Sequence, residues 1–358
     1  MKYSHTIAVA MPAGPAWAQA GWRAFVVAAA LAVAGCRTPA SPPTVARAWE
    51  AMGGIFSVAA WGRDSAALAH AADQALDSVR RVDSLLSGIS KVSEVARINR
   101  GRAARVSTTF VAVLVASLDV AQRSHGAYDP TRHDWRGVTF DRARGMVSLR
   151  RGLALDFGGI AEGYALDRAL LSLGAVADSV LLNLGGQYLI KMPARTTSAP
   201  RVGRRVGVPD PDNTLRTIAV IEIPPGTWSV RTLSPVDQPA PIMDPRTGAP
   251  AVRARSVTTV ARDGMTAIAW SNAFFVLGCD SALALAPQLG ETQVGVLCID
   301  ERVRWSADLD GRVLTDSART VGTAPAPAPE PAPAGAVEPS GSTIRQGPDS
   351  SRRDPRTS

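Results

Sequence analysis

The sequence predicts an α+β fold, in which a mixed sheet is flanked by helices in a single globular domain with disordered ends. The spacing of apolar residues between 44 and 321 changes repeatedly between the period of a strand and that of a helix. The chain has 358 residues, of which 46% are hydrophobic and 20% are charged, so it can bury a substantial core. Residues 38–43 and 323–358 are rich in Pro and almost free of large apolar residues, so neither segment can fold alone.

Local patterns place the elements of this fold. Residues 54–61 read as a strand. Apolar residues recur at intervals of three and four between Leu68 and Leu86, which predicts an amphipathic helix over 65–86, with Asp64 or Ser65 as its N-cap. The other expected helices cover 107–123 (ended by His125-Gly126), 160–173 and 263–277, and the other expected strands cover 145–149, 180–184, 217–223, 255–261 and 293–299.

The amino-terminal segment has the features of an export signal. Residues 24–34 form an apolar run that is too short for a typical transmembrane helix, and Arg23 precedes it. Val33-Ala34-Gly35-Cys36 resembles the lipobox of bacterial lipoproteins, so we expect lipidation of Cys36 and anchoring to the cell-envelope membrane on the periplasmic side. Ordinary secretory cleavage near the same place is the alternative, and it also exports the chain. The expected organisation is a signal peptide at 1–35, a tether at 36–43, a folded domain at 44–321 and a Pro/Ala-rich tail at 322–358.

Charge and cysteine content exclude two classes of site. The 39 Lys and Arg against 31 Asp and Glu give a net charge of +8, but the Arg residues are scattered, which argues against a nucleic-acid surface. Three Cys and four His without paired spacing exclude a structural zinc site. Cys279 and Cys298 lie in apolar runs, where we favour buried free thiols over a disulfide bridge.

Three glycine-bearing segments are the first candidates for chemistry. They cover residues 155–167, 183–187 and 244–248. In the first, Gly158-Gly159 stands just before a predicted helix, where backbone N–H groups and the positive end of the helix dipole suit a diphosphate. Each segment alone is better explained by a tight turn that needs glycine. None of them fits the P-loop or the Gly-x-Gly-x-x-Gly pattern of dinucleotide-binding folds.

The order of these segments along the chain is more specific than any one of them. Together with Ala51-Met52-Gly53-Gly54, residues 93–99, residues 126–131 and the run from Met265 to Gly278, the series resembles the FAD:protein FMN transferase (ApbE-like) family. The resemblance covers about residues 52 to 300 and implies an ApbE-like, T-fold-like mixed sheet. Members of that family are exported, often lipid-anchored enzymes. They split FAD with the help of Mg²⁺, attach FMN to a Thr of an exported target protein and release AMP.

The resemblance also implies a set of site residues. Met52 matches a flavin-contacting Met, Ile242 a position that contributes backbone, and Tyr128 either stacks on a ring of FAD or is a core aromatic. The complete set of expected FAD-binding positions is Met52, Ala127, Tyr128, Asp129, Asp156, Glu162 and Ile242. The catalytic base cannot be named from the sequence.

The metal-binding positions depart from the family pattern. Gly159 matches the residue that donates a main-chain carbonyl to the metal, but Ile268 stands where the family has an Asp ligand and Asn272 where it has a Thr. Ser271 and Asn272 could each offer one neutral oxygen to Mg²⁺, which binds oxygen ligands. A different register would bring Asp263 or Asp280 to this place. We therefore expect weakened Mg²⁺ binding. An FAD-binding or partner-binding lipoprotein without transfer activity is one alternative, and hydrolysis of FAD to FMN and AMP, which needs the same metal, is another.

Overall fold

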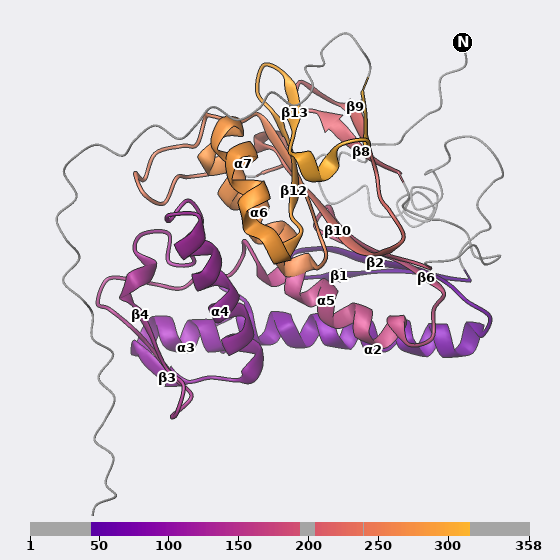
Figure 1. Cartoon of the computed structure of the whole chain (residues 1–358). Helices are drawn as coiled ribbons and strands as arrows, with labels where there is room; N and C mark the ends of the chain where they lie inside the picture. The colour runs from indigo at the N-terminus through magenta and orange to yellow at the C-terminus, as the bar shows by residue number, and fades with distance from the viewer. Residues whose placement is uncertain (1–43, 194–204, 239, 316–358) are drawn as a thin grey trace, which may run out of the picture. The chain divides into compact units, whose positions relative to one another are not determined.

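The computed structural model describes residues 44–193, 205–238 and 240–315, all within one compact unit (Figure 1). The α+β class and the single folded domain are confirmed. The expected signal peptide, Cys36, the tether, the Pro/Ala-rich tail and the last residues of the expected domain lie outside the described residues. Within the described part of the chain, no helix is both long enough and apolar enough to cross a bilayer.

The centre of the fold is an eight-stranded sheet. Its strand order is β1-β2-β6-β7-β10-β11-β12-β13, and each of the neighbouring pairs is antiparallel. The sequence predicted β2, β6, β11 and β12 but not their neighbours β1, β7, β10 and β13. The strands are β1 (Val45–Ala51), β2 (Gly54–Trp61), β6 (Ser179–Leu184), β7 (Gln187–Met192), β10 (Gly226–Leu233), β11 (Ser256–Ala261), β12 (Gly295–Ile299) and β13 (Val303–Trp305).

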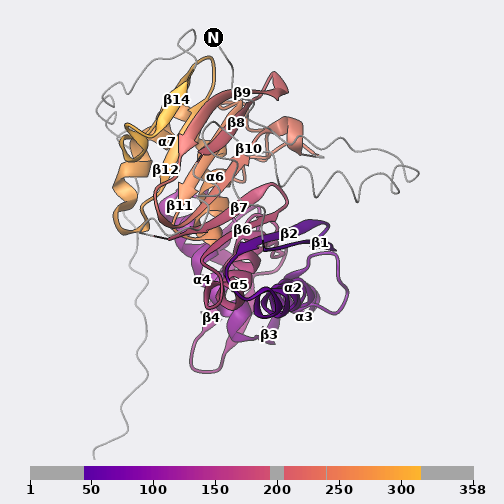
Figure 2. The same ribbon diagram turned by 90° about the vertical axis from the view of Figure 1, so that its right-hand side faces the viewer.

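The helices pack mainly on one face of this sheet. Figure 1 shows α2 (Ser65–Leu86) and α5 (Ala161–Gly174) side by side, and Figure 2 views α2 nearly end-on beside β1 and β2. Helix α6 (Gly264–Leu277) contacts α5, β10 and β11. These three helices and α4 (Thr108–Arg123) match the predicted ranges to within one residue. The remaining helical segments are α3 (Glu94–Gly101), α7 (Cys279–Leu285) and the short 3₁₀ turns η2 (Trp135–Gly137), η3 (Pro235–Asp237), η4 (Ala286–Thr292) and η5 (Ala307–Leu309).

Alternation along the strands divides the buried side chains between two cores. In β12, Val296 and Cys298 belong to the larger core on the helical face, and Leu297 and Ile299 belong to a smaller core on the other face. A three-stranded sheet in the order β14-β9-β8 contributes to the smaller core: β14 (Val313–Thr315), β9 (Asn213–Glu222) and β8 (Arg205–Asp210). A second small sheet has the order β3-β5-β4: β3 (Ala103–Arg105), β5 (Met146–Leu149) and β4 (Val138–Asp141).

The expectation of two free thiols is wrong, because Cys279 and Cys298 form a disulfide with a Cα–Cα distance of 5.4 Å. Cys279 is the first residue of α7 and Cys298 lies on β12. Both side chains are buried, as expected, but α7 packs against β12 and brings them within bonding distance. Apolar flanking sequence indicates burial but cannot show that two such residues meet.

Two glycines allow helices α5 and α6 to approach closely. A Cβ on Gly163 would lie 2.2 Å from the carbonyl oxygen of Gly264, so a side chain at this position would collide with the backbone of α6. Asp167 on α5 accepts hydrogen bonds from the N–H groups of Gly264 and Met265 at the start of α6. Gln187 donates to the carbonyl of Gly264 at 2.6 Å. These contacts hold the first half of α5 against the start of α6, next to the candidate site.

Candidate functional site

The site is built around the amino-terminal end of α5. The carboxylate of Asp156 accepts a hydrogen bond from the N–H of Gly158 at 2.8 Å, which shapes the loop that enters the helix. The N-cap residue is Ile160, whose side chain has no oxygen with which to cap the helix. The positive end of the α5 dipole is therefore available to an anion.

Tyr128 forms one wall beside this helix end. Its side chain is buried, and its hydroxyl lies 3.4 Å from the hydroxyl of Ser117. Burial raises the pKa of Tyr128 well above its ordinary value. A Cβ on Gly159 would lie 3.2 Å from Cε2 of the Tyr128 ring, so the ring packs against Gly159. The ring belongs to the buried core, and stacking on a ring of FAD stays a prediction. The adjacent Ala127 is also buried.

Asp129 organises the loop that follows Tyr128. One carboxylate oxygen accepts hydrogen bonds from the N–H and the hydroxyl of Thr131 at 2.6 and 2.7 Å, and the other accepts from the N–H of Trp135 at 2.9 Å. The side chain is buried. In this structure Asp129 therefore positions its own loop, and a role in contacting FAD stays a prediction.

Asp156 carries a basic partner that sequence reasoning missed. Arg132 forms an ion pair with Asp156 at 2.5 Å, and the N–H of Asp156 donates to the carbonyl of Pro130 at 2.7 Å. Arg132 has a φ of 58°, so the loop turns sharply at this residue. The pattern Asp-Pro-Thr-Arg gave no signal for this pairing, because η2, β4 and β5 separate the two partners in the sequence.

Two tight turns bring Met52 and Glu162 to the same side of the site. Met52 and Gly53 form the two-residue turn between β1 and β2, with φ values of 52° and 76°. A Cβ on Gly54 would lie 3.8 Å from Cα of Gly185 in the turn between β6 and β7, and a Cβ on Gly185 would lie 2.7 Å from Oε2 of Glu162. The glycine at position 185 therefore leaves room for the carboxylate of Glu162.

Arg231 on β10 is the basic partner on this side. Its guanidinium donates to the carbonyl of Gly185, and its Nη1 lies 3.9 Å from Oε2 of Glu162. Burial raises the pKa of Glu162, and the charge of Arg231 opposes this shift. Sequence reasoning missed Arg231 because β10 was not predicted.

Ile242 lies in the loop between η3 and β11 and packs against the larger core. Its carbonyl accepts a hydrogen bond from the N–H of Ala251 at 2.8 Å. In the same loop Arg246 binds both oxygens of Asp244, at 2.9 and 2.7 Å, and this pairing lowers the pKa of Asp244. A Cβ on Gly126 would lie 3.5 Å from Cγ of Arg246, so this loop packs close to the Tyr128 segment.

Of the three expected metal-ligating residues, Gly159 and Asn272 lie side by side. Nδ2 of Asn272 lies 3.3 Å from the carbonyl oxygen of Gly159 and 2.9 Å from that of Ile268. Ser271 is fully buried and donates its hydroxyl to the carbonyl of Ile268 at 2.7 Å. Gly159 and Asn272 are thus adjacent, but the side-chain group between them is a hydrogen-bond donor. The described residues hold no group of three or more His, Cys, Asp or Glu that could bind a metal ion.

A different register does not restore a carboxylate here. Asp263 is the N-cap of α6, where it accepts hydrogen bonds from the N–H and hydroxyl of Thr266. It lies nine residues, or about 13 Å along a helix, before Asn272. Asp280 is an exposed residue in α7 that pairs with Arg304. The residues present do not fit an Mg²⁺ site of the expected kind.

Comparison with known proteins supports the arrangement. A family model described as the ApbE family matches residues 52–134 and 132–296. The crystal structure of the ApbE protein from Thermotoga maritima is similar with a TM-score of 0.63 and 24% identity, covering 74% of this chain and 97% of that one. The flavin transferase ApbE from Vibrio cholerae gives a TM-score of 0.61 at 21% identity, covering 75% and 98%. The apo flavinyl transferase ApbE from Pseudomonas stutzeri gives 0.63 at 20% identity, covering 74% and 95%. No curated protein sequence gives a significant match.

Proposed function

Because the chain belongs to the ApbE family, we propose that it is a flavin transferase that binds FAD at the amino-terminal end of α5. It would move the FMN part of FAD to a Thr of an exported protein and release AMP. The observation that supports FAD binding is the meeting of separate segments at that helix end: the Tyr128 ring lies against Gly159, Asp156 binds the N–H of Gly158, and the turn at Gly185, next to the Met52 turn, lies against Glu162.

In this reaction the Thr hydroxyl oxygen attacks the phosphorus of FMN. The new bond is the phosphate ester between Thr and FMN, and the bond from that phosphorus to the bridging oxygen breaks. AMP leaves with the electron pair, and the hydroxyl proton passes to a base or to water. The chain's own contribution is to hold the diphosphate at a helix end, where N–H groups and the helix dipole favour negative charge.

The second candidate is an FAD-binding or partner-binding protein that no longer transfers FMN. Asn272 and Ile268 favour it, because an amide donor and an aliphatic side chain stand where a cation would assist departure of the phosphate. The flavin transferase and an FAD-binding protein both require FAD to bind, so these two separate only at the transfer step.

We also propose that the mature chain is exported and anchored through lipidated Cys36. The lipobox-like segment supports this location. A buried disulfide supports it independently, because such bonds persist in oxidising compartments and are rare in the cytosol.

The test is to incubate the chain with FAD, Mg²⁺ and an exported Thr-containing acceptor, and to follow the acceptor mass together with FAD fluorescence. A gain in mass equal to covalent FMN supports transfer. FAD binding without a change in mass supports the second candidate. An absence of FAD binding refutes both flavin functions and leaves only a partner-binding protein with this fold. If the chain binds FAD but does not transfer FMN, Ile268→Asp with Asn272→Thr should raise transfer, provided that the double variant folds and binds FAD.

A further inference from the structure

We propose that this chain holds its flavin dinucleotide without a divalent cation, and that the carboxamide of Asn272 takes the cation's place on the carbonyl of Gly159. The proposal rests on the FAD binding proposed above. It concerns which groups balance the negative charge of the diphosphate, and it can be tested on the protein without flavin.

The direction of the hydrogen bonds made by Asn272 is the first argument for the proposal. The two groups that face the Asn272 amide, at 3.3 and 2.9 Å, are the carbonyl oxygens of Gly159 and Ile268. Two acceptors require a donor between them, so the NH₂ side of the amide faces them and its oxygen faces away. The opposite orientation would place three oxygens together without a proton.

The chemistry of the groups beside Gly159 gives the second argument. Nδ2 of Asn272 lies 3.3 Å from the carbonyl oxygen of Gly159, and a Cβ on Gly159 would be 3.2 Å from Cε2 of the Tyr128 ring. Mg²⁺ binds oxygen ligands, and neither an amide N–H group nor a ring carbon can serve as one. These two neighbours of Gly159 therefore offer no ligand to a cation.

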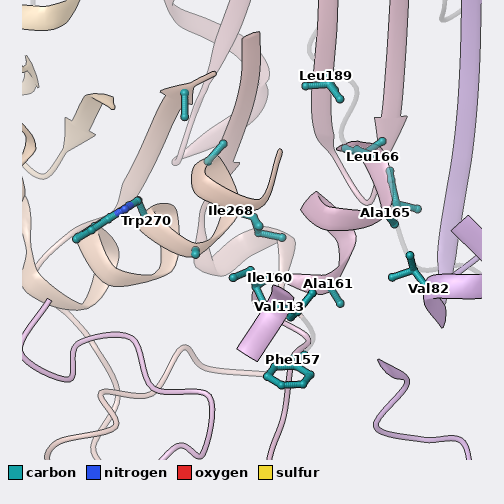
Figure 3. Packing of buried hydrophobic residues seen from close by; sticks show 14 of the residues in the cluster. Val82, Val113, Phe157, Ile160, Ala161, Ala165, Leu166, Leu189, Ile268 and Trp270 are labelled. Carbon is teal, nitrogen blue, oxygen red and sulfur yellow. The ribbon is translucent and has the colours of Figure 1, made fainter. Parts of the chain in front are cut away.

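The neighbouring position offers no ligand either. Ile268 is buried, and Figure 3 shows its side chain pointing from α6 toward Ile160 and Ala161 at the start of α5. Its Cγ2 would lie 2.8 Å from a Cβ on Gly163, which places it firmly in the helix contact. The one hydroxyl nearby, that of Ser271, is already used to donate to the carbonyl of Ile268.

The charge balance of the site gives the third argument. Three of its carboxylates each face an arginine, in the pairs Asp156–Arg132 at 2.5 Å, Asp244–Arg246 at 2.7 Å and Glu162–Arg231 at 3.9 Å. Carboxylates balanced in this way exert little net attraction on a dication. The arginines also bring guanidinium N–H groups to the site, and guanidinium binds phosphate oxygens well. The chain thus offers its own hydrogen-bond donors to a diphosphate.

Titration with Mn²⁺, followed by electron paramagnetic resonance of the free ion, tests the cation directly. The wild-type chain should bind no stoichiometric Mn²⁺. Asn272→Asp replaces the donor by a carboxylate of the same shape and should create a site that binds Mn²⁺ at least about tenfold more tightly. Ile268→Asp with Asn272→Thr should do the same.

Gln288→Glu is the matched control. Gln288 also donates its carboxamide to the carbonyl four residues earlier, that of Ala284 at 2.8 Å, but on an exposed turn away from the site. The Gln288→Glu variant should bind Mn²⁺ no differently from the wild type. Stoichiometric Mn²⁺ binding by the wild type, or a folded Asn272→Asp chain that gains none, would overturn the proposal.

FAD affinity provides the second measurement and needs no variant. For the wild type, the dissociation constant of FAD should agree in Mg²⁺ and in EDTA to within about twofold, and any FMN transfer should persist in EDTA. Tightening by Mg²⁺ of about tenfold or more would overturn the cation-free site. A failure to bind FAD in either buffer would instead refute the proposed function, while the Mn²⁺ titration would still decide the question of the cation.

Discussion

Replacing Gly163 by Ala should separate helices α5 and α6. The new Cβ would lie 2.2 Å from the carbonyl oxygen and 2.4 Å from the carbonyl carbon of Gly264, and 2.8 Å from Cγ2 of Ile268. Two of these atoms belong to backbone, which cannot rotate away as a side chain can, so the helices must move apart. Overpacking of this kind costs about 1–3 kcal/mol, and a backbone collision belongs at or above the upper end.

The displacement should also reach the site, because Gly159 on the loop before α5 contacts Asn272 on α6. Urea unfolding measures the stability of the variant, and FAD fluorescence measures its binding. Gly174→Ala is the control on the same helix, since its Cβ would meet only Cγ of Leu170 at 4.0 Å. It should be neutral or stabilise the protein by about 0.4–1 kcal/mol. Equal unfolding midpoints for Gly163→Ala and wild type would refute the close contact of the two helices.

Three further changes test other parts of the structure. Removing the disulfide with Cys279→Ala and Cys298→Ala should lower the free energy of unfolding by about 3 kcal/mol, because the bridge closes a loop with a sequence separation of 19. A reductant should lower the urea midpoint of the wild type by the same amount. No shift of the midpoint would argue against the bridge. Burial raises the pKa of Asp167 from 3.8 to about 7, so the folded state binds its proton more tightly than the unfolded state and stability should fall as the pH rises from about 4 to about 7. Asp167→Asn should flatten that dependence in urea unfolding at several pH values, and an unchanged slope would contradict the assignment. Glu162→Gln removes the negative charge that faces Arg231, so the site becomes more positive and FAD binding should tighten about tenfold in a fluorescence titration, whereas an unchanged affinity would remove Glu162 from the site.

Helices were the most predictable part of the fold. The apolar spacing between Leu68 and Leu86 defines one face of α2, and Asp64 caps it by accepting hydrogen bonds from two N–H groups, as expected. Strands β2, β6, β11 and β12 were also predictable, because they are short apolar runs bounded by turns. β10 was not, since its sequence Gly-Thr-Trp-Ser-Val-Arg-Thr-Leu mixes polar and apolar residues on both faces. Its place between β7 and β11 is set by pairing with those neighbours.

The sequence by itself determined the fold class, the family resemblance and the aliphatic residue at position 268, where the resemblance expects an acidic one, because each can be read from residue types and their order. The tertiary structure alone decided what faces the carbonyl of Gly159. Gly159 and Asn272 are 113 residues apart, and only the packing of α5 on α6 turns an amide N–H toward that carbonyl. The pairing of Arg132 with Asp156 and the bridge between Cys279 and Cys298 were decided in the same way. Contacts between distant residues depend on how the elements pack, and local patterns of sequence do not specify that packing.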